Sequence, residues 1–563
     1  MRRRLFLAGS AATLLSTKLP GASSGNGFPC SVSDEPSSVA ISGESAAKGV
    51  QADAATGPSR GPWRRLMLDA AAVEASEGLH RVFHQATKRD GPVIVADRPW
   101  EGRSAITGPY VYGTVLREGD RFRLWYQLLN EGNHVGYAES FDGVRWTKPD
   151  LDVVTFQGNQ KTNLVVSAFA PDLSSGVHCH NPSVIRCPDS FGPNRRFALY
   201  GFDGNSKGPR VAFSSDGIHW DYAWDHASPG TAMPLFSSSD VVSFFFDPYE
   251  NRMVSTWKTR NRRGRAVGVA LSSDGLTWKK VLDGPVFVAD DHDPDEAQIY
   301  GMPVFPYQGL YIGLPWIYSA RYFRYGEYSV DKLHDAQNDS PRTMDVQLAW
   351  SWDLINWTRP IPRQPLIPRG TGNEDWDRGM IVTARAPIVV GDELWFYYGG
   401  TDKVHDEPRA TAAIGLATLR LDGFCSLSTR DVTQEVTQEP ARLSESGEDT
   451  DPKEGWLVTR REPFRIPQVT INARTWKGGE IRAEILDRKG RVIPGFSRTE
   501  CSPFEGDSVK FELQWGRTTF PPEHHTKDYR IRFLLRNAEL FSWLPAGLDP
   551  GEPDLARFPE AGP

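Results

Sequence analysis

The stretch Ser140-Phe-Asp142-Gly143-Val-Arg-Trp146 decides the fold, because it returns three more times along the chain. The further copies are Ser214-Ser-Asp216-Gly217-Ile-His-Trp220, Ser272-Ser-Asp274-Gly275-Leu-Thr-Trp278 and the degenerate Ser351-Trp-Asp353-Leu-Ile-Asn-Trp357. In each box we expect the aspartate to accept backbone N–H bonds within a tight turn while the glycine supplies a positive φ. The tryptophan can then pack back over the turn. We therefore interpret the boxes as architectural and assign no catalysis to their aspartates.

Each box follows a short alternating strand, such as His134-Val-Gly-Tyr-Ala138, which itself follows an aromatic strand, such as Arg121-Phe-Arg-Leu-Trp-Tyr126. Another strand ending in a turn comes first in every unit. Five such units fill residues 95–425, and the fifth ends in Asp422-Gly423 without the tryptophan. A lone small sheet cannot bury both of its faces, so the units must pack on one another in a ring. The repeat predicts a five-bladed β-propeller, which we place at residues 61–424.

Beyond the last repeat, residues 455–545 hold alternating segments separated by turns, as is typical of an antiparallel β-sandwich. The intervening residues 425–454 are expected to form an acidic linker, and residues 546–563 a tail. The predicted fold is therefore all-β: a five-bladed β-propeller followed by a C-terminal antiparallel β-sandwich.

The N-terminus begins Met1-Arg-Arg-Arg-Leu-Phe-Leu and continues into a short apolar run, which is the layout of an export signal. Its arginine pair resembles a twin-arginine signal, and an ordinary secretory signal is the alternative. We assign residues 1–60 to this signal and a flexible linker. No later run reaches the roughly 18–20 apolar residues of a membrane span. The mature protein is expected to be exported, periplasmic or extracellular, with no membrane span.

Charge and cysteine content limit which ligands and cross-links the protein is expected to have. The 563 residues carry 64 Lys+Arg against 71 Asp+Glu, a net charge of −7, and no basic block, which argues against nucleic acid as a partner. Cys179 and Cys187 lie close in sequence, and we favour free buried thiols over a disulfide between them. No spacing typical of a zinc site occurs, so no metal ligands are assigned.

Several stretches resemble a known group of proteins: Trp100-Glu101, Tyr137 to Pro149, His180-Asn181-Pro182, Gln298-Ile-Tyr300 and Asp392 to Gly400. Together with the boxes, they resemble secreted five-bladed-propeller glycoside hydrolases of families 32 and 43, and most closely bacterial proteins with a family 32 N-terminal-like domain. The resemblance implies a carbohydrate substrate and three carboxylates on the innermost strands. The families' W-M-N-D-P-N, R-D-P and E-C motifs are absent, so no catalytic residue transfers by motif.

Candidate catalytic residues are therefore chosen by their place before the first strand of a repeat. Glycosidic hydrolysis needs one carboxylic acid to protonate the leaving oxygen and a second carboxylate as base or nucleophile. We assign the acid to Glu296 and the base or nucleophile to Glu101, with Asp240 orienting them. The acidic run Asp290–Glu296 also has the oxygen ligands that Ca²⁺ prefers, so a structural Ca²⁺ is an alternative interpretation of this run. No other cofactor is expected.

Sugar recognition needs flat apolar faces beside hydrogen-bonding groups. His180 is a candidate donor to a sugar hydroxyl, and the candidates for the apolar faces are Trp100, Tyr110, Tyr300, Trp316 and Trp376. Arg385 is a candidate partner for one of the acids or for an anionic substrate.

The preferred function is an exported glycoside hydrolase acting on a polysaccharide or oligosaccharide. A non-catalytic carbohydrate-binding propeller is the first alternative, which the missing family motifs favour. A sialidase-like hydrolase with an arginine cluster and a tyrosine nucleophile is the second alternative. It predicts several arginines on the inner strands, and only Arg378 and Arg385 are obvious candidates, which counts against it.

Overall fold

The computed structural model describes residues 62–545, apart from 69–70, 103–105, 130–132, 168–178, 205, 223–232, 321–340, 431–453, 463–466, 518 and 522–527. The export signal and linker predicted for residues 1–60, most of the acidic linker 425–454 and the tail 546–563 lie outside the described residues.

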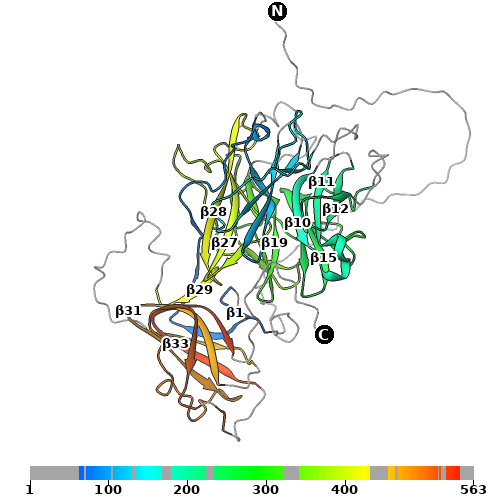
Figure 1. Cartoon of the computed structure of the whole chain (residues 1–563). Helices are drawn as coiled ribbons and strands as arrows, with labels where there is room; N and C mark the ends of the chain where they lie inside the picture. Colours follow the sequence, from blue (N-terminus) through cyan, green and yellow to red (C-terminus); the bar gives the residue numbers. More distant parts are fainter. Residues whose placement is uncertain are drawn as a thin grey trace, which may run out of the picture. The chain divides into compact units, whose positions relative to one another are not determined.

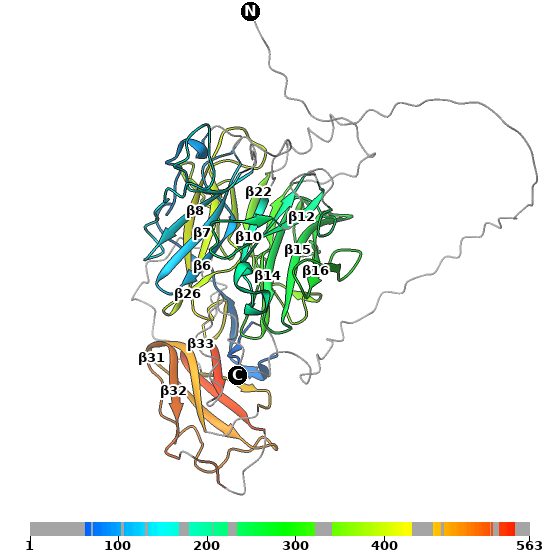
Figure 2. The same ribbon diagram turned by 45° about the vertical axis from the view of Figure 1, so that its right-hand side comes forward.

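The first three repeats form three separate four-stranded antiparallel sheets (Figures 1 and 2). In each sheet the first strand of the repeat lies at one edge, and the short strand after the box lies at the other. The sheets consist of β6 (Tyr110–Glu118), β7 (Arg121–Leu128), β8 (His134–Ser140) and β9 (Leu164–Val166); β10 (His180–Arg186), β11 (Phe197–Asp203), β12 (Gly208–Ser214) and β13 (Asp221–Tyr222); and β14 (Val242–Asp247), β15 (Arg252–Asn261), β16 (Gly264–Ser272) and β17 (Lys279–Lys280).

In the fourth repeat three of the strands are interrupted. Pro303 and Pro315 lie at two of the breaks, where a residue without an N–H cannot continue the ladder. One set of segments forms a fourth four-stranded sheet: β19 (Val304–Tyr307), β20 (Leu310–Gly313), β23 (Ala349–Ser351) and β24 (Trp357–Thr358). The other set joins a nine-stranded sheet: β18 (Ala297–Gly301), β21 (Trp316–Ser319) and β22 (Thr343–Val346).

The fifth repeat lies in that same nine-stranded sheet. β22 meets β25 in parallel at Met344 and Met380, which joins the two repeats. Two short strands from upstream of the first repeat also pair with β28 in this sheet. Its further strands are β25 (Met380–Thr383), β26 (Ile388–Val390), β27 (Glu393–Thr401), β28 (Ala410–Arg420), β4 (Thr87–Lys88) and β5 (Ile106–Thr107).

The predicted propeller is thus confirmed, but not as five separate sheets. The described strands form four separate four-stranded sheets, while the strands of the fifth repeat merge with half of the fourth. The merger has a physical cause: the interruptions free short segments whose N–H and C=O groups must find partners, and β25 supplies one.

The boxes have the predicted geometry. Asp142 Oδ1 accepts the N–H groups of Val144 and Arg145 at 2.9 and 2.7 Å, and above all the Arg145 backbone bond holds the pKa of Asp142 well below its usual range. Gly143 has a φ of 71°. Its carbonyl accepts the Tyr397 hydroxyl of the fifth repeat at 2.8 Å. A Cβ at Gly143 would come 2.7 Å from that hydroxyl oxygen, so glycine permits the contact between neighbouring blades.

The C-terminal domain is an eight-stranded β-structure with its own buried core. Two long strands, β31 and β33, pair with each other along most of their length and pass through register shifts that bend them across both layers of the sandwich (Figures 1 and 2). The strands are β1 (Arg65–Leu66), β2 (Val73–Glu77), β3 (His80–Phe83), β29 (Cys425–Ser428), β30 (Glu454–Thr459), β31 (Gln468–Leu486), β32 (Asp507–Gln514) and β33 (Arg530–Pro545).

This sheet differs from the predicted boundaries at two points. Strands β1, β2 and β3, which lie within the range 61–424 assigned to the propeller, pair with C-terminal strands instead. Strand β29, at the start of the predicted linker 425–454, pairs with β3 and β33. The open edges of a sheet need hydrogen-bonding partners, and here N-terminal segments that are distant in sequence supply them. Local sequence patterns do not predict such pairing.

A buried aspartate joins the two domains. Asp422, the last residue of the repeat pattern, accepts the hydroxyl of Tyr307 in β19 at 2.5 Å and that of Ser542 in β33 at 2.6 Å. Arg64 pairs with the same carboxylate at 2.6 Å. The fifth Asp-Gly unit, which lacks the tryptophan, therefore connects the propeller to the sandwich.

Two smaller predictions are also tested. Cys179 and Cys187 are both free and buried, as expected. Within the part of the chain that the structure describes, no helix is long and apolar enough to cross a membrane. The helical turns in that part are short 3₁₀ segments: η2 (Pro99–Glu101), η3 (Asp189–Phe191) and η4 (Pro193–Arg195).

Candidate functional site

The first strands of the repeats surround the centre of the ring, where β10 contacts both β6 and β14, and β25 contacts β6. Side chains tie these strands to their neighbours. Thr114 in β6 accepts the N–H of Val184 at 3.0 Å, and Asn181 in β10 accepts the N–H of Val242 at 2.9 Å. Because these bonds fix the relative register, the starts of the first strands come together at one level.

Aromatic rings line that level. Tyr112 stacks on Trp316 with ring centroids 5.4 Å apart, and it meets Tyr110 and His180 edge-on at 4.8 and 5.2 Å. Tyr300 completes the group from β18 and is buried like Tyr112. We call Tyr110, Tyr112, His180, Asp240, Lys258, Tyr300 and Trp316 the axial cluster.

A carboxylate–ammonium pair lies within this aromatic wall. Asp240, just ahead of β14, pairs with Lys258 of β15, whose backbone N–H donates to the carbonyl of Val241 at 2.8 Å. The Lys258 side chain is buried, and its ammonium lies 4.4 Å from the centroid of the Tyr300 ring. The Asp240 side chain remains 45% exposed. The Asp240 carboxylate thus faces solvent, whereas the Lys258 ammonium that pairs with it is buried.

The protonation states follow from these contacts. Burial opposes ionisation of Asp240, but the neighbouring Lys258 ammonium outweighs burial and lowers the pKa of Asp240 to about 2. Burial lowers the pKa of His180 to about 4, although the Asp240 charge acts in the opposite direction. At neutral pH the cluster therefore presents an ionised Asp240 and a neutral His180.

Tyr300 also contacts a histidine from the loop between β27 and β28. Its hydroxyl lies 2.9 Å from Nε2 of His405, and Nδ1 of His405 lies 2.7 Å from Oδ2 of Asp406. The Arg265 guanidinium lies 5.5 Å from the centroid of the Tyr300 ring. Burial raises the pKa of the Tyr300 phenol, so Tyr300 is neutral at physiological pH and can donate or accept a hydrogen bond.

Glu101 lies in a different environment. Its carboxylate accepts the N–H groups of Asp97 and Arg98 at 2.9 and 3.1 Å, the Tyr126 hydroxyl at 2.7 Å and the Lys148 ammonium at 2.8 Å. The residue is 1% exposed. These four donors occupy its oxygens and fix the turn before the first repeat.

The neighbouring Trp100 is also structural in its contacts, because its indole N–H donates to Asn163 at 2.8 Å and its ring is buried in the core between the first and fifth repeats. Trp376 is half-buried and stacks on Tyr398 of β27 with ring centroids 5.6 Å apart. Of the predicted site residues, the structure brings five into the axial cluster: Tyr110, His180, Asp240, Tyr300 and Trp316.

Glu296 comes just before β18, and its carbonyl accepts the Ala320 N–H at 3.0 Å. Glu296 lies in a turn, and β18 has a register shift between Ile299 and Gly301. Within the strand, Gln298 contacts Arg265 at 3.0 Å, and the Tyr300 ring lies near the same arginine.

The acidic run is occupied by arginines. Arg359 donates to both oxygens of Asp293, at 2.5 and 2.7 Å, and Arg363 binds Asp290. Within the described ranges, no group of three or more His, Cys, Asp or Glu side chains is arranged to hold a metal ion. The Ca²⁺ interpretation of this run stays a prediction.

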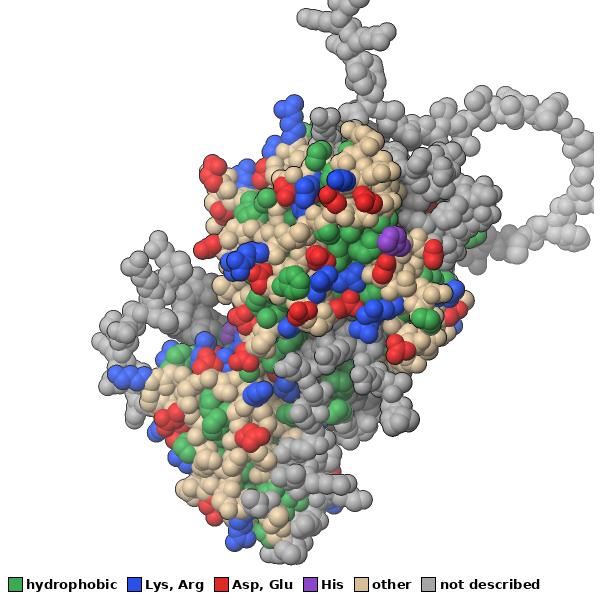
Figure 3. Space-filling view, viewed as in Figure 1, with side chains coloured by type: hydrophobic (Ala, Val, Ile, Leu, Met, Phe, Trp, Pro, Cys, Tyr) green, Lys and Arg blue, Asp and Glu red, His purple; other side chains and the backbone are tan. Residues whose placement is uncertain are grey.

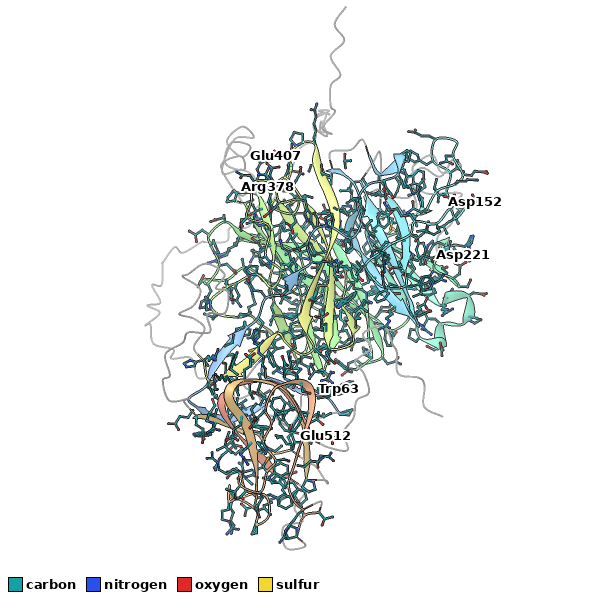
Figure 4. All side chains as sticks on the ribbon, turned by 60° about the vertical axis from the view of Figure 1, so that its left-hand side comes forward. Trp63, Asp152, Asp221, Arg378, Glu407 and Glu512 are labelled. Carbon is teal, nitrogen blue, oxygen red and sulfur yellow. The ribbon has the colours of Figure 1, made fainter. Side chains whose placement is uncertain are left out.

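A pocket of about 690 Å³ opens beside the strands that join the fourth and fifth repeats. Its charged lining includes Arg378 and Glu407, which Figure 4 labels at the same end of the propeller, together with Asp345, Arg369 and Lys403. On the face seen in Figure 3, basic and acidic side chains are likewise interspersed. This mixture of charge contrasts with the single exposed carboxylate of the axial cluster.

Sequence reasoning missed Tyr112, Lys258 and His405. A weak signal existed for Lys258, which follows the aromatic strand Met253–Trp257 and is followed by more basic residues. His405 had none, because its loop reaches Tyr300 from 105 residues away.

Comparisons with known proteins give a distant likeness. No family model matches the chain, and no curated protein sequence matches it. Among solved structures, a thermostable family-43 glycoside hydrolase is 15% identical with a TM-score of 0.38, covering 63% of this chain and 99% of its own. A Bombyx mori family-32 β-fructofuranosidase is 12% identical with a TM-score of 0.36, covering 81% and 94%.

A third similar structure belongs to the family 130 of mannoside phosphorylases, described as containing glycoside hydrolases that target β-1,2 mannosidic linkages in Candida mannan. It is 14% identical with a TM-score of 0.39, covering 60% of this chain and 94% of its own. The chain thus resembles propeller glycoside hydrolases, as expected, but at these TM-scores their activities are not transferred to it.

Proposed function

We propose that the protein is an exported glycoside hydrolase that binds a sugar residue in the axial cluster. The observation that carries the proposal is the half-exposed, ionised Asp240, held by the buried Lys258 among aromatic rings where the first strands begin. A carboxylate accepts hydrogen bonds from sugar hydroxyls, and aromatic faces pack against the C–H faces of the ring.

In this proposal Asp240 is the base or nucleophile, a role that the sequence had given to Glu101. Such a group must be ionised and reachable, and Asp240 is both. Glu101 is closed off by its four donors. Neutral His180 beside Asp240 is suited to hold a substrate hydroxyl or a water.

The proton donor remains Glu296. It lies in the turn just before β18, the strand that carries Tyr300, and the Tyr300 ring contacts Lys258 of the axial cluster. The separation of the two carboxylates would set the outcome, at about 5–5.5 Å for retention and about 6.5–9.5 Å for inversion.

The test is release of reducing ends from a panel of neutral and acidic polysaccharides. We expect Asp240→Asn and Glu296→Gln to lose turnover and to keep the fold. Asp291→Asn is the matched control, because Asp291 belongs to the same acidic run as Glu296 and is 92% exposed. Full activity of Asp240→Asn would refute the assignment.

A binding-only propeller is the second candidate, and one observation favours it: among the placed side chains, Asp240 is the single carboxylate of the axial cluster. This candidate predicts saccharide binding by the wild type without release of reducing ends. Asp240→Asn would then weaken binding itself, as followed by calorimetry.

A further inference from the structure

Arg385 is an unusual arginine. It follows β25 in the fifth repeat and is 7% exposed, yet its Nε has no hydrogen-bond acceptor among the described residues. No acidic side chain in those ranges forms an ion pair with it, and burial alone lowers the pKa of its guanidinium to about 10.

Nε of Arg359 also has no hydrogen-bond acceptor in the described part of the chain, so what sets Arg385 apart from the other buried arginines is its lack of a counter-charge. Arg65, Arg123, Arg210 and Arg359 are all at most 9% exposed. Each of them pairs with a carboxylate, at distances between 2.5 and 2.9 Å. Arg385 is the buried arginine, within the placed parts of the chain, that has no such counter-charge.

Backbone hydrogen bonds fix the position of this segment. The N–H of Ala384 donates to Tyr397 in β27, at 2.9 Å, and the N–H of Arg385 donates to Gly113 in β6, at 3.2 Å. β25 ends at Thr383, and Arg385 lies in a bend between β25 and β26. The N–H bond to Gly113 holds this bend against the first strand of the first repeat, next to Tyr112.

Two contacts connect this segment to the axial cluster. The Thr383 hydroxyl oxygen accepts the indole N–H of Trp316 at 3.2 Å, and Trp316 stacks on Tyr112. Arg385 follows two residues later, and its N–H donates to the carbonyl of Gly113, the residue after Tyr112. The buried Arg385 thus adjoins the strands that carry the wall of the proposed sugar site.

We propose that Arg385 binds the carboxylate of an acidic saccharide, so that the substrate or ligand of the axial cluster is a uronate-type sugar. A buried, unpaired charge is costly and is relieved when a ligand brings the opposite charge. Guanidinium is the group best matched to a carboxylate, which it can bind through two parallel N–H bonds. The saccharide part of this inference rests on the proposed function.

The sialidase-like alternative needs Arg385 and Arg378 to act together, and their surroundings differ. Arg378 is exposed, donates to the Asp402 carbonyl at 2.9 Å and lines the outer pocket. The anion site is therefore assigned to Arg385 without it.

The experiment is calorimetry of the full chain with digalacturonate and with its neutral counterpart galactobiose, for wild type, Arg385→Met and Arg385→Lys. We expect wild type to bind the acidic disaccharide at least 10-fold more tightly than the neutral one. Arg385→Met should abolish that preference and Arg385→Lys should keep part of it. Equal binding of the two sugars by wild type would overturn the inference, as would an undiminished preference in Arg385→Met.

Thermal unfolding of the free protein separates a binding role from a structural one. If the Arg385 guanidinium is a ligand-binding group, Arg385→Met removes an unpaired buried charge. The ligand-free variant should then unfold at a higher temperature than ligand-free wild type. Digalacturonate should then raise the unfolding temperature of wild type alone. A lower unfolding temperature for ligand-free Arg385→Met would overturn the inference in favour of a structural role.

Inorganic anions form the last arm. The saccharide assignment would be overturned if phosphate or chloride displaced digalacturonate completely and galactobiose showed no binding. Failure of the proposed hydrolysis can be told apart from failure of the Arg385 inference. If wild type binds digalacturonate but releases no reducing ends, the Arg385 inference stands without hydrolysis. If wild type and Arg385→Met hydrolyse neutral glycans at equal rates, the Arg385 inference fails.

Discussion

Glu101 and Asp240 occupy similar places in the chain, each ahead of the first strand of a repeat, and each pairs with a buried lysine. Their surroundings differ. Glu101 is closed in by four donors, and Lys148 beside it is 4% exposed. Asp240 keeps nearly half of its side chain in solvent. The comparison shows that an ion pair becomes structural or available according to how many further donors surround the carboxylate.

The largest effect is expected from breaking the closed pair. Glu101→Ala would leave the buried Tyr126 hydroxyl without its acceptor and the Lys148 ammonium with Asp97, at 2.6 Å, as its remaining carboxylate, which costs about 1–3 kcal/mol of the free energy of unfolding. Urea unfolding followed by tryptophan fluorescence measures it. A loss below about 1 kcal/mol would mean that Glu101 is not the structural carboxylate inferred from its bonds.

The open pair should respond in activity. Asp240→Asn keeps the shape of the side chain and removes the charge, so turnover should fall by about 10²-fold or more. It also leaves the buried Lys258 ammonium without its carboxylate, so the unfolding midpoint should fall, and Asp240→Asn/Lys258→Met should recover it without recovering turnover. Reducing-end assays and urea unfolding on the same preparation provide both readouts. Unchanged turnover in Asp240→Asn would erase the distinction between the two sites.

Lys258→Met sharpens the comparison further. Lys258 is the main group that lowers the pKa of Asp240, so its removal should raise that pKa toward the ordinary aspartate value. The acid limb of the pH–rate profile, which reports loss of the Asp240 anion, should then move to higher pH. An unchanged acid limb would show that Asp240 is not the titrating base.

The smallest effect concerns His180. Its pKa is lowered to about 4 in the folded protein, so between about pH 4 and the ordinary histidine value of about 6.5 the unfolded chain binds more protons. Stability should therefore decline as pH falls through this window. His180→Gln should flatten the decline, as measured by urea midpoints at pH 7 and pH 4.5. Parallel pH profiles would contradict the lowered pKa.

Much of the fold was predictable because it depends on local chemistry. An aspartate that caps its own turn and a glycine at positive φ act within six residues, so the boxes predict the propeller from local sequence alone. The merging of the fourth and fifth repeats was not predictable. It depends on how segments separated by broken strands share hydrogen bonds, and Met344 meets Met380 only after both repeats have packed.

The candidate site divides in the same way. Repeat position selected Asp240, His180 and Tyr300, which belong to the axial cluster, but it selected Glu101 on the same grounds. Lys148 and Tyr126, which close Glu101 in, come from positions 47 and 25 residues away. Their effect on exposure is invisible in the local pattern.

Hydrogen-bonded turns and alternating strands are short-range consequences of residue type, and they can be read along the chain with confidence in their physical cause. Which carboxylate keeps a free oxygen, and which arginine stays without a counter-charge, depends on desolvation and on donors that arrive from distant segments. Those quantities exist only once the sheets have closed around Asp240 and Arg385, because burial and charge pairing are properties of the assembled interior.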